Sequence, residues 1–464
     1  MISHSCQLLL ILADWTVKYP LMRDIVLLGA IIFFLGLAFR YPYAGLLTWG
    51  WLTIMNPHML VYGFALGWPF NFGVALVTLA AWFFSREKMR WPGDALPWLM
   101  AALVAWMTFD SFFAVDGDWS WPLWDRTVKI YAFVFLCLAM INNKARIHAM
   151  VWIIVISIGF FGVKGGIFTI MKAGAYHVYG PDNTIISDNN QLALAVVMVL
   201  PLTYYLFEHT GNRWLRFGIA LTFPLQIATV LGSYSRGGLV ALAVVLGFFW
   251  LRSRRKLLHL AVAAMLVLGA LQAMPPAFFE RVNSIDSVQT DESFQGRLTA
   301  WSVAYKYAVD HFPLGAGFAG PQRKPVYNSY YPDAETHAAH SIYFQVLGEH
   351  GFPALFIYLL IAALSLRNTR MVVKRCKDRP EMAWARDLAT MTEVSLVGFY
   401  VGGAALSMAY YDGFLLLQAF TSILRGMTEP HRMPAATIDD QPSGRSAPSN
   451  RSTATASQRA LLGG

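Results

Sequence analysis

Long apolar runs alternate with short polar segments along most of this 464-residue chain. A run of about 18 or more apolar residues can cross a hydrocarbon core of roughly 30 Å. Backbone amides find no water inside lipid, so such runs form helices. The pattern predicts an all-α polytopic membrane protein with about twelve transmembrane helices. They are expected near 24–39, 70–84, 95–113, 127–142, 147–171, 190–208, 216–233, 237–252, 257–273, 341–366, 391–408 and 413–427.

Basic clusters follow alternate runs and set the expected orientation. Lys and Arg gather after Phe84, Ile141, Leu206, Trp250 and Leu366, and the positive-inside rule places such loops in the cytoplasm. The net charge of +9 is therefore a matter of topology, and nucleic-acid binding is excluded. With only 14% charged residues, against roughly 25% in soluble domains, a soluble protein is excluded too.

The segment 43–70 is apolar and rich in Trp, but Asn56-Pro57 and several glycines interrupt it. A full crossing there would invert every later loop against the positive-inside rule. We therefore interpret it as an interfacial or re-entrant element. With that interpretation, both ends of the chain lie in the cytoplasm and the loop 274–340 lies outside.

The long outer loop before the tenth span is expected to be partly helical. A stripe at helical spacing within residues 294–309 predicts a helix that packs against the bundle, formed by Leu298, Trp301, Tyr305 and Ala308. The whole chain is expected to have three parts: an N-terminal extension at 1–21, a transmembrane domain at 22–427, and a cytoplasmic tail at 428–464. The tail is rich in Pro, Ser, Thr, Ala and Gly, a composition typical of disorder.

Two arginines on the outer side are candidate phosphate ligands. Ser235-Arg236-Gly237-Gly238 joins two spans, and Arg297 begins the loop helix. The guanidinium group presents a rigid fork that matches phosphate oxygens. The alternatives are a snorkelling side chain for Arg236 and a surface salt bridge for Arg297. Two converging arginines would stabilise a leaving pyrophosphate much as a divalent metal does.

Two histidines close the outer loop, at the start of the next span. His340 can accept a proton from an attacking hydroxyl near neutral pH, although a lone histidine at a helix start is more often structural. His337 and His340, with Asp333 and Glu335 nearby, are alternatively a metal site. The arginine pair favours a site without metal.

Three further residues on the outer side extend the candidate site. Asn190 precedes a span, where it either caps the helix or contacts substrate. Arg126 and Lys129 begin another span and extend the phosphate site. No span centre carries the acidic chain that a proton-coupled transporter needs.

The order of these motifs resembles the O-antigen ligase/polymerase superfamily. The resemblance covers about residues 190–366 and rests on Ser235-Arg236-Gly237, Gly296-Arg297 with Trp301, the turn 313–317, His340-Ser341-Ile342-Tyr343 and Glu349-His350-Gly351. The N-terminal part, with Met22-Arg23-Asp24 and Asn56-Pro57-His58, is similar to the O-glycosylation ligase branch. Ser341 departs from the pattern, because many members have Asn after the histidine.

The resemblance implies an inverting, metal-independent glycosyltransferase without a cofactor, in the bacterial inner membrane and facing the periplasm. Its donor would be a glycan on undecaprenyl diphosphate, and its acceptor a sugar hydroxyl of lipid A-core. By position His340 matches the general base, and Arg236 and Arg297 match the arginines that hold the diphosphate. His337 and Tyr343, on either side of the base, complete the expected substrate site. A polymerase, a protein O-glycosylation ligase and, from another class, a polysaccharide transporter or flippase remain alternatives.

Overall fold

The computed structural model describes residues 20–85, 87, 89–252 and 292–429. Within these ranges the chain is helical and has no β-strand. The α-helices, apart from three short 3₁₀ turns, are α2 (Pro20–Arg40), α3 (Pro42–Met55), α4 (Phe70–Phe84), α5 (Leu96–Ser111), α6 (Gly117–Met140), α7 (Lys144–Met171), α8 (Asn189–His209), α9 (Arg213–Gly232), α10 (Arg236–Arg252), α13 (Glu292–Asp310), α14 (Lys324–Tyr330), α15 (Ile342–Arg375), α16 (Ala383–Gly403) and α17 (Asp412–Met427).

Apolar helices of membrane-spanning length confirm the expected class of protein. In the described part of the chain, five helices are long and apolar enough to cross a membrane, namely α2, α7, α8, α9 and α15. The helices α4, α5 and α10 are apolar but shorter. The expected span at 257–273 lies outside the described residues, whereas each of the others overlaps a helix. The predicted count of about twelve crossings did not include α3, which is a further apolar helix of the bundle, and the number of crossings stays a prediction.

Glycines on α7 let this helix approach α9 closely. A Cβ on Gly166 would lie 2.1 Å from the carbonyl oxygen of Leu225, so no side chain fits there. The Thr229 hydroxyl donates a hydrogen bond to the carbonyl of Gly162. Without a hydrophobic driving force between helices in lipid, such small-residue contacts and polar bonds hold them together. The pair α7–α9 leads to the loop that carries Arg236.

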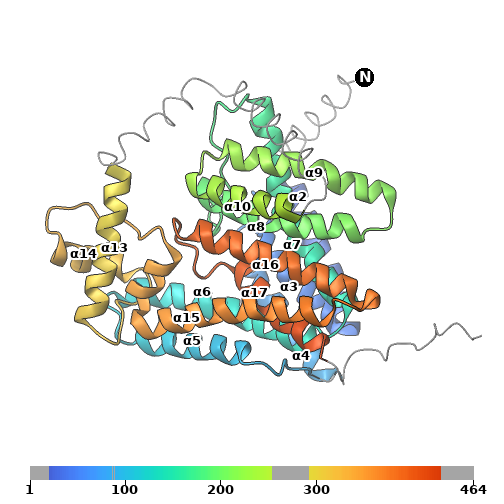
Figure 1. The fold of residues 1–464 in the computed structure, drawn as a ribbon, viewed down its shortest axis with the longest axis horizontal. Helices are drawn as coiled ribbons and strands as arrows, with labels where there is room; N and C mark the ends of the chain where they lie inside the picture. Colours follow the sequence, from blue (N-terminus) through green and yellow to red (C-terminus); the bar gives the residue numbers. More distant parts are fainter. Residues whose placement is uncertain (1–19, 86, 88, 253–291, 430–464) are drawn as a thin grey trace, which may run out of the picture.

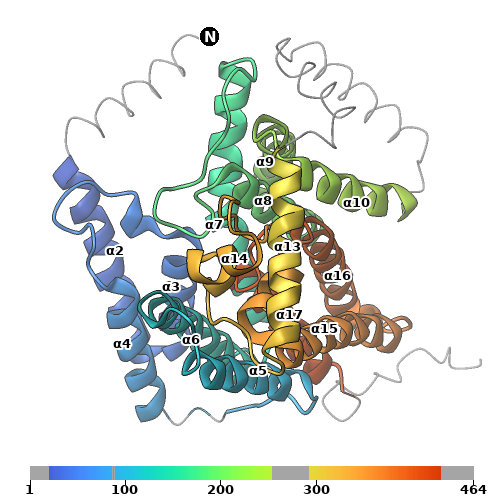
Figure 2. The same cartoon turned by 90° about the vertical axis from the view of Figure 1, so that its left-hand side faces the viewer.

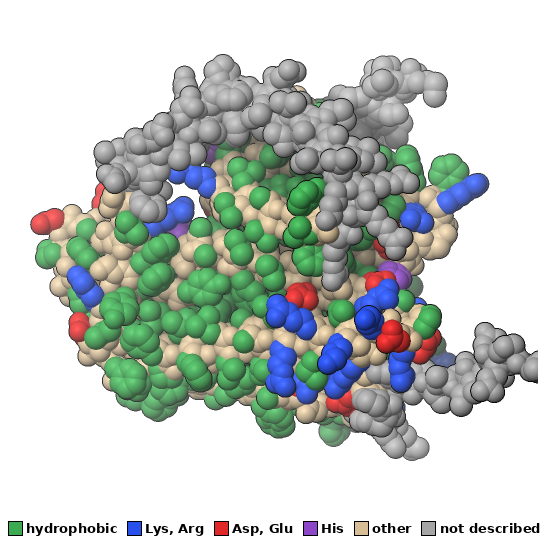
Figure 3. Space-filling model, viewed as in Figure 1, with side chains coloured by type: hydrophobic (Ala, Val, Ile, Leu, Met, Phe, Trp, Pro, Cys, Tyr) green, Lys and Arg blue, Asp and Glu red, His purple; other side chains and the backbone are tan. Residues whose placement is uncertain are grey.

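The basic clusters meet at one end of the bundle. Arg146, just inside α7, forms an ion pair with Glu87, and His209, the last residue of α8, pairs with Asp387 of α16 at 3.2 Å. Lys144 lies over the Trp384 ring. Figure 3 shows Lys and Arg gathered on the end of the molecule away from α13 and α14. This distribution is the one that the alternating clusters predicted.

The interfacial or re-entrant interpretation of residues 43–70 is wrong. At the basic end, the Tyr43 hydroxyl donates a hydrogen bond to the carbonyl of Arg146. The loop after α3 reaches the start of α2, where the amide of Ala65 donates to Asp24 Oδ1 at 2.6 Å. The segment thus passes from one end of the bundle to the other. It escaped recognition because α3 is only 14 residues long and Asn56, in a left-handed conformation, ends it.

Because residues 43–70 pass from one end of the bundle to the other, α2 runs towards the basic end and not away from it as predicted. Its first residues, including Asp24, lie opposite the basic clusters, whereas the end of α17 lies among them, because Arg375 donates to the carbonyl of Arg425. Both termini of the chain lie outside the described residues, so their expected cytoplasmic location stays a prediction. The inversion falls on α2 alone, and the later loops keep their expected sides.

The outer loop forms a helical cap over one end of the bundle, made of α13, α14 and their connections (Figure 1, Figure 2). The predicted stripe on α13 faces α15 only in part. Trp301 stacks on Phe344 and Ala308 is buried, but Leu298 and Tyr305 remain 39% and 53% exposed. The deeper face is instead formed by Ala300, Val303, Ala304 and Tyr307.

Candidate functional site

A tight turn carries His340 between the cap and α15. His340 has φ +43°, in the left-handed region, which costs free energy unless neighbours hold it. The indole Nε1 of Trp301 donates to the carbonyl of Ala339 at 2.6 Å. The Trp301 ring stacks on Phe344, with centroids 4.9 Å apart and planes 8° from parallel. One side chain of α13 thus clamps both flanks of the histidine.

The charged groups around His340 come from three segments. The pKa of His340 lies below its ordinary value because the ring is largely buried. The positive charge of Arg297 lowers this pKa further, the carboxylate of Asp188 raises it, and His337 lowers it. His337 itself lies against Gly296, where an added Cβ would come within 2.8 Å of the ring. Arg297 and His337 are therefore close enough to His340 for their charges to act on it, whereas the predicted convergence of Arg236 with Arg297 stays a prediction.

The loop before α10 lies beside the start of α8. The buried side-chain amide of Asn189 donates to the carbonyl of Ser233 at 2.7 Å. Ser235 is fully buried, and its Oγ accepts the amide of Gly238 at 3.0 Å, so it caps α10 in this conformation. Arg236 is the first residue of α10 and its side chain is exposed. The loop before α10 therefore exposes the side chain of Arg236 and buries that of Ser235.

The other candidate residues divide between the site and its surroundings. Asn190 donates from Nδ2 to Asp188 Oδ1 at 3.0 Å, next to the His340 cluster. Tyr343 points into the bundle, where its hydroxyl donates to the carbonyl of Tyr400 at 3.0 Å. Lys129 is exposed and pairs with Asp125 on its own helix. These contacts favour a structural role for Tyr343 and give Lys129 a local partner.

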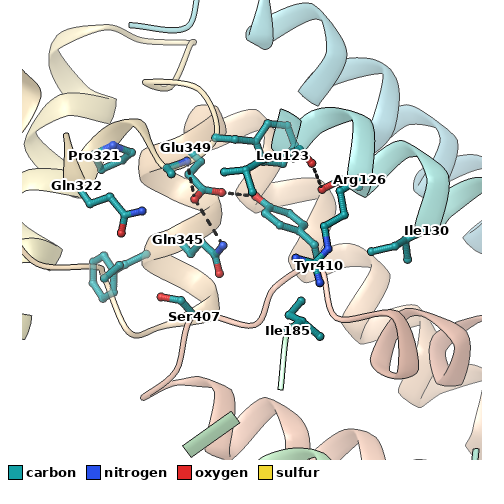
Figure 4. Close-up of a pocket in the computed structure, with 15 residues that line it drawn as sticks. Leu123, Arg126, Ile130, Ile185, Pro321, Gln322, Gln345, Glu349, Ser407 and Tyr410 are labelled. Atoms are coloured by element: carbon teal, nitrogen blue, oxygen red, sulfur yellow. Dashed lines mark hydrogen bonds between the residues drawn. The ribbon is translucent and has the colours of Figure 1, made fainter. Parts of the chain in front are cut away.

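A cavity of about 230 Å³ lies next to the histidine turn and is bounded by Ala339. Arg126 of α6 lines it, together with polar residues that the sequence analysis did not assign to the site: Gln322, Gln345, Glu349, Ser407 and Tyr410. Figure 4 shows these side chains around the cavity. The signal available in the sequence was Gln345 and Glu349 at i,i+4 in an otherwise apolar helix, because polar residues in such a helix are usually functional.

A buried hydrogen-bonded group joins two bundle helices to the turn at Gly315. His350 Nδ1 donates to Asp110 Oδ2 at 2.8 Å, and both side chains are fully buried. The amide of Gly315 donates to the other carboxylate oxygen, Oδ1, at 2.9 Å. The Trp106 indole donates to the carbonyl of His350 at 2.8 Å. Helices α5 and α15 and the turn at 315 therefore hold one another in place.

A second contact ties the cap to α6. Arg323 pairs with Asp116, with Nε and Oδ2 2.8 Å apart, and its guanidinium lies over the Trp119 ring. Asp116 also caps α6 by accepting the amide of Trp119. These residues fix the loop that follows Gly317 against the start of α6.

The alternative metal site finds no support in the geometry. The described part of the chain, which includes His337, His340, Asp333 and Glu335, contains no group of three or more His, Cys, Asp or Glu side chains placed to hold a metal ion. The charged groups that act on His340 are the guanidinium of Arg297, the carboxylate of Asp188 and the imidazole of His337. Such a set suits an anionic ligand and a proton transfer.

The fold and the site define a multi-pass helical membrane protein with a cationic, histidine-containing site under a helical cap. Residues 221–359 match the model of the family described as O-Antigen ligase, a stretch that includes Arg236, Arg297 and His340. This match confirms the resemblance to the O-antigen ligase superfamily. Residues 22–211 match a family of unknown function (DUF5935). No curated protein matches the chain.

Proposed function

We propose that this protein is an O-antigen ligase: an inverting, metal-independent glycosyltransferase that moves a glycan from undecaprenyl diphosphate to a sugar hydroxyl of lipid A-core. It would be embedded in the bacterial inner membrane through residues 22–427, with the site facing the periplasm and a cytoplasmic tail at 428–464. The observation that carries the proposal is the convergence of Arg297, His337 and His340 within the segment that matches the ligase family.

The proposed reaction uses His340 as a general base. Its depressed pKa keeps the imidazole neutral near pH 7, so it can accept a proton. The acceptor hydroxyl gives that proton to His340 while its oxygen attacks the anomeric carbon of the donor. The bond from that carbon to the diphosphate oxygen breaks on the opposite face, so the configuration inverts and undecaprenyl diphosphate leaves.

The arginines supply charge stabilisation to the leaving group. Negative charge builds on the diphosphate in the transition state, and guanidinium groups placed beside it would stabilise that charge. Arg297 is close enough to His340 to lower its pKa. Arg236 begins α10, directly after the loop that lies beside the start of α8. The proposed periplasmic location of the site is supported by the basic clusters, which gather at the end opposite the cap.

The test is transfer by the purified protein in proteoliposomes that contain undecaprenyl-diphosphate glycan and lipid A-core. We expect transfer to persist in EDTA, and His340→Ala to reduce it by at least about a hundredfold, the usual scale of a general base. Lys306→Gln, a cation change on the exposed part of α13, serves as the matched control. Loss of transfer on chelation, or full transfer by His340→Ala, would overturn the mechanism.

A polymerase or a protein O-glycosylation ligase would share this site, since only the acceptor differs. The same assay separates the three functions by replacing lipid A-core with a second donor molecule or with a Ser-containing peptide. A transporter would instead move the donor across the membrane without forming a glycosidic bond, and it would not require His340.

A further inference from the structure

The cavity bounded by Ala339 has the dimensions of a small subsite. Its volume of about 230 Å³ lies below the roughly 300–1,000 Å³ of pockets that hold drug-sized ligands. It therefore accommodates one sugar ring and leaves the remainder of an oligosaccharide outside. Ala339 precedes His340, so the cavity adjoins the turn that carries the proposed base, although the His340 side chain does not line it.

The walls of the cavity combine aromatic faces with hydrogen-bonding groups. Phe318, Phe344 and Tyr410 line it, and flat aromatic surfaces pack against the C–H faces of a sugar ring. Gln322 and Ser407 add a side-chain amide and a hydroxyl, each able to donate and to accept. A ring that carries hydroxyl groups on an apolar body matches this pairing better than a lipid chain or a bare phosphate.

A fixed polar network holds one side of the cavity. Glu349 Oε2 accepts the hydroxyl of Tyr410 at 2.8 Å, and Oε1 accepts the amide of Ala319 at 3.0 Å. The side-chain amide of Gln345 lies 3.5 Å from Oε1 and accepts the amide of Ala409 through its own oxygen. Figure 4 shows Glu349 between Gln345 and Tyr410. The wall is thus preorganised, which limits the ordering cost of binding.

The charges in the cavity balance. Arg126 lines the side formed by α6, and Glu349 lines the side formed by α15. Within the described residues Arg126 forms no ion pair, and Asp412 acts on it only through space. Arg126 thus has a carboxyl group on two sides, Glu349 across the cavity and Asp412 behind it, so the cavity has no excess positive charge and suits a neutral ring whose hydroxyl groups reach Arg126 and Glu349.

We infer that this cavity is the acceptor subsite and binds one neutral pyranose ring of the acceptor glycan, with Gln322 and Arg126 as its contacts. The inference rests on the proposed function. The acceptor is favoured over the donor because neither Arg236 nor Arg297 lines the cavity. The diphosphate ligands and the cavity are therefore separate, and His340 lies at the boundary that they share.

The test measures the KM for lipid A-core and for the donor separately in the proteoliposome assay. We expect Gln322→Ala and Arg126→Gln each to raise the acceptor KM about tenfold, the effect of losing one good hydrogen bond of roughly 1.4 kcal/mol. The donor KM stays unchanged. Ser407→Trp fills the cavity and abolishes saturable acceptor binding. Lys306→Gln serves as the control and keeps both KM values.

Methyl β-glucopyranoside and methyl β-glucuronide then probe the charge of the subsite. We expect the neutral glycoside to compete with lipid A-core and the anionic one not to. Stronger competition by the glucuronide overturns the neutral assignment. Unchanged acceptor KM values in both variants, or a rise in the donor KM alone, overturn the acceptor subsite. Absence of transfer by the wild-type protein instead overturns the proposed function itself.

Discussion

Replacing Trp301 by Phe tests whether α13 holds the base in place. The ring of Phe keeps much of the stacking on Phe344 but loses the 2.6 Å hydrogen bond to the carbonyl of Ala339. One such bond is worth about 1 kcal/mol net, a free energy similar to the roughly 1–3 kcal/mol that a left-handed residue such as His340 stores. We expect kcat to fall about fivefold, and about twentyfold or more in Trp301→Ala, which also removes the stacking.

The assay is initial-rate transfer in proteoliposomes as a function of pH. A general base works above its pKa, so the acid limb of the rate profile follows the pKa of His340. Burial lowers that pKa, and a loosened turn exposes the ring, so the acid limb moves to higher pH in Trp301→Phe. A purely structural loss of active protein lowers the rate and leaves the limb in place. Tyr305→Phe, one turn along α13 and 53% exposed, is the matched control. If Trp301→Phe transfers glycan at the wild-type rate and the acid limb of its pH profile does not move, Trp301 does not hold His340 in place.

Two further predictions concern charge. Arg297 lowers the pKa of His340 and Asp188 raises it, so the acid limb should move to higher pH in Arg297→Gln and to lower pH in Asp188→Asn; shifts in the same direction would show that the limb belongs to another group. Asp110→Asn disturbs a fully buried hydrogen bond to His350, and it should cost about 1–3 kcal/mol and lower the apparent Tm in detergent. The exposed Asp125→Asn should cost less than about 1 kcal/mol, and equal Tm values in the two variants would contradict the role of the buried pair.

The helices were predictable because each long apolar run must satisfy its own backbone in lipid. Hydropathy did not identify α3, because its 14 residues are fewer than an isolated membrane-spanning helix needs. Its burial depends on the neighbouring helices, which the hydropathy of the segment does not reveal. The direction of α2 was lost with it. Only contacts such as that between Asp24 and Ala65 show the direction in which α2 and α3 run.

The site was predictable where the residue type is rare for its place. Arginines and histidines outside the basic clusters stand out, and the structure gathers Arg297, His337 and His340. The cavity was hidden because its walls come from five segments that lie far apart in the sequence, and because Tyr410 belongs to a mostly apolar stretch. Side-chain direction was equally hidden. Tyr343 follows the histidine in sequence, yet it points towards α16.

The kink in α15 makes the cap an integral part of the bundle. Gly351, with φ +74°, interrupts the helix, and the freed carbonyls of Gly348 and Glu349 accept the amides of Ala316 and Gly317 at 2.9 Å. No side chain fits at Gly315, where a Cβ would come within 2.3 Å of this backbone. A cap whose backbone is hydrogen-bonded to a membrane-spanning helix in this way does not move as a separate lid. Under the proposed function, substrates would enter and leave along the flanks of the cap, while residues 315–317 stay hydrogen-bonded to α15.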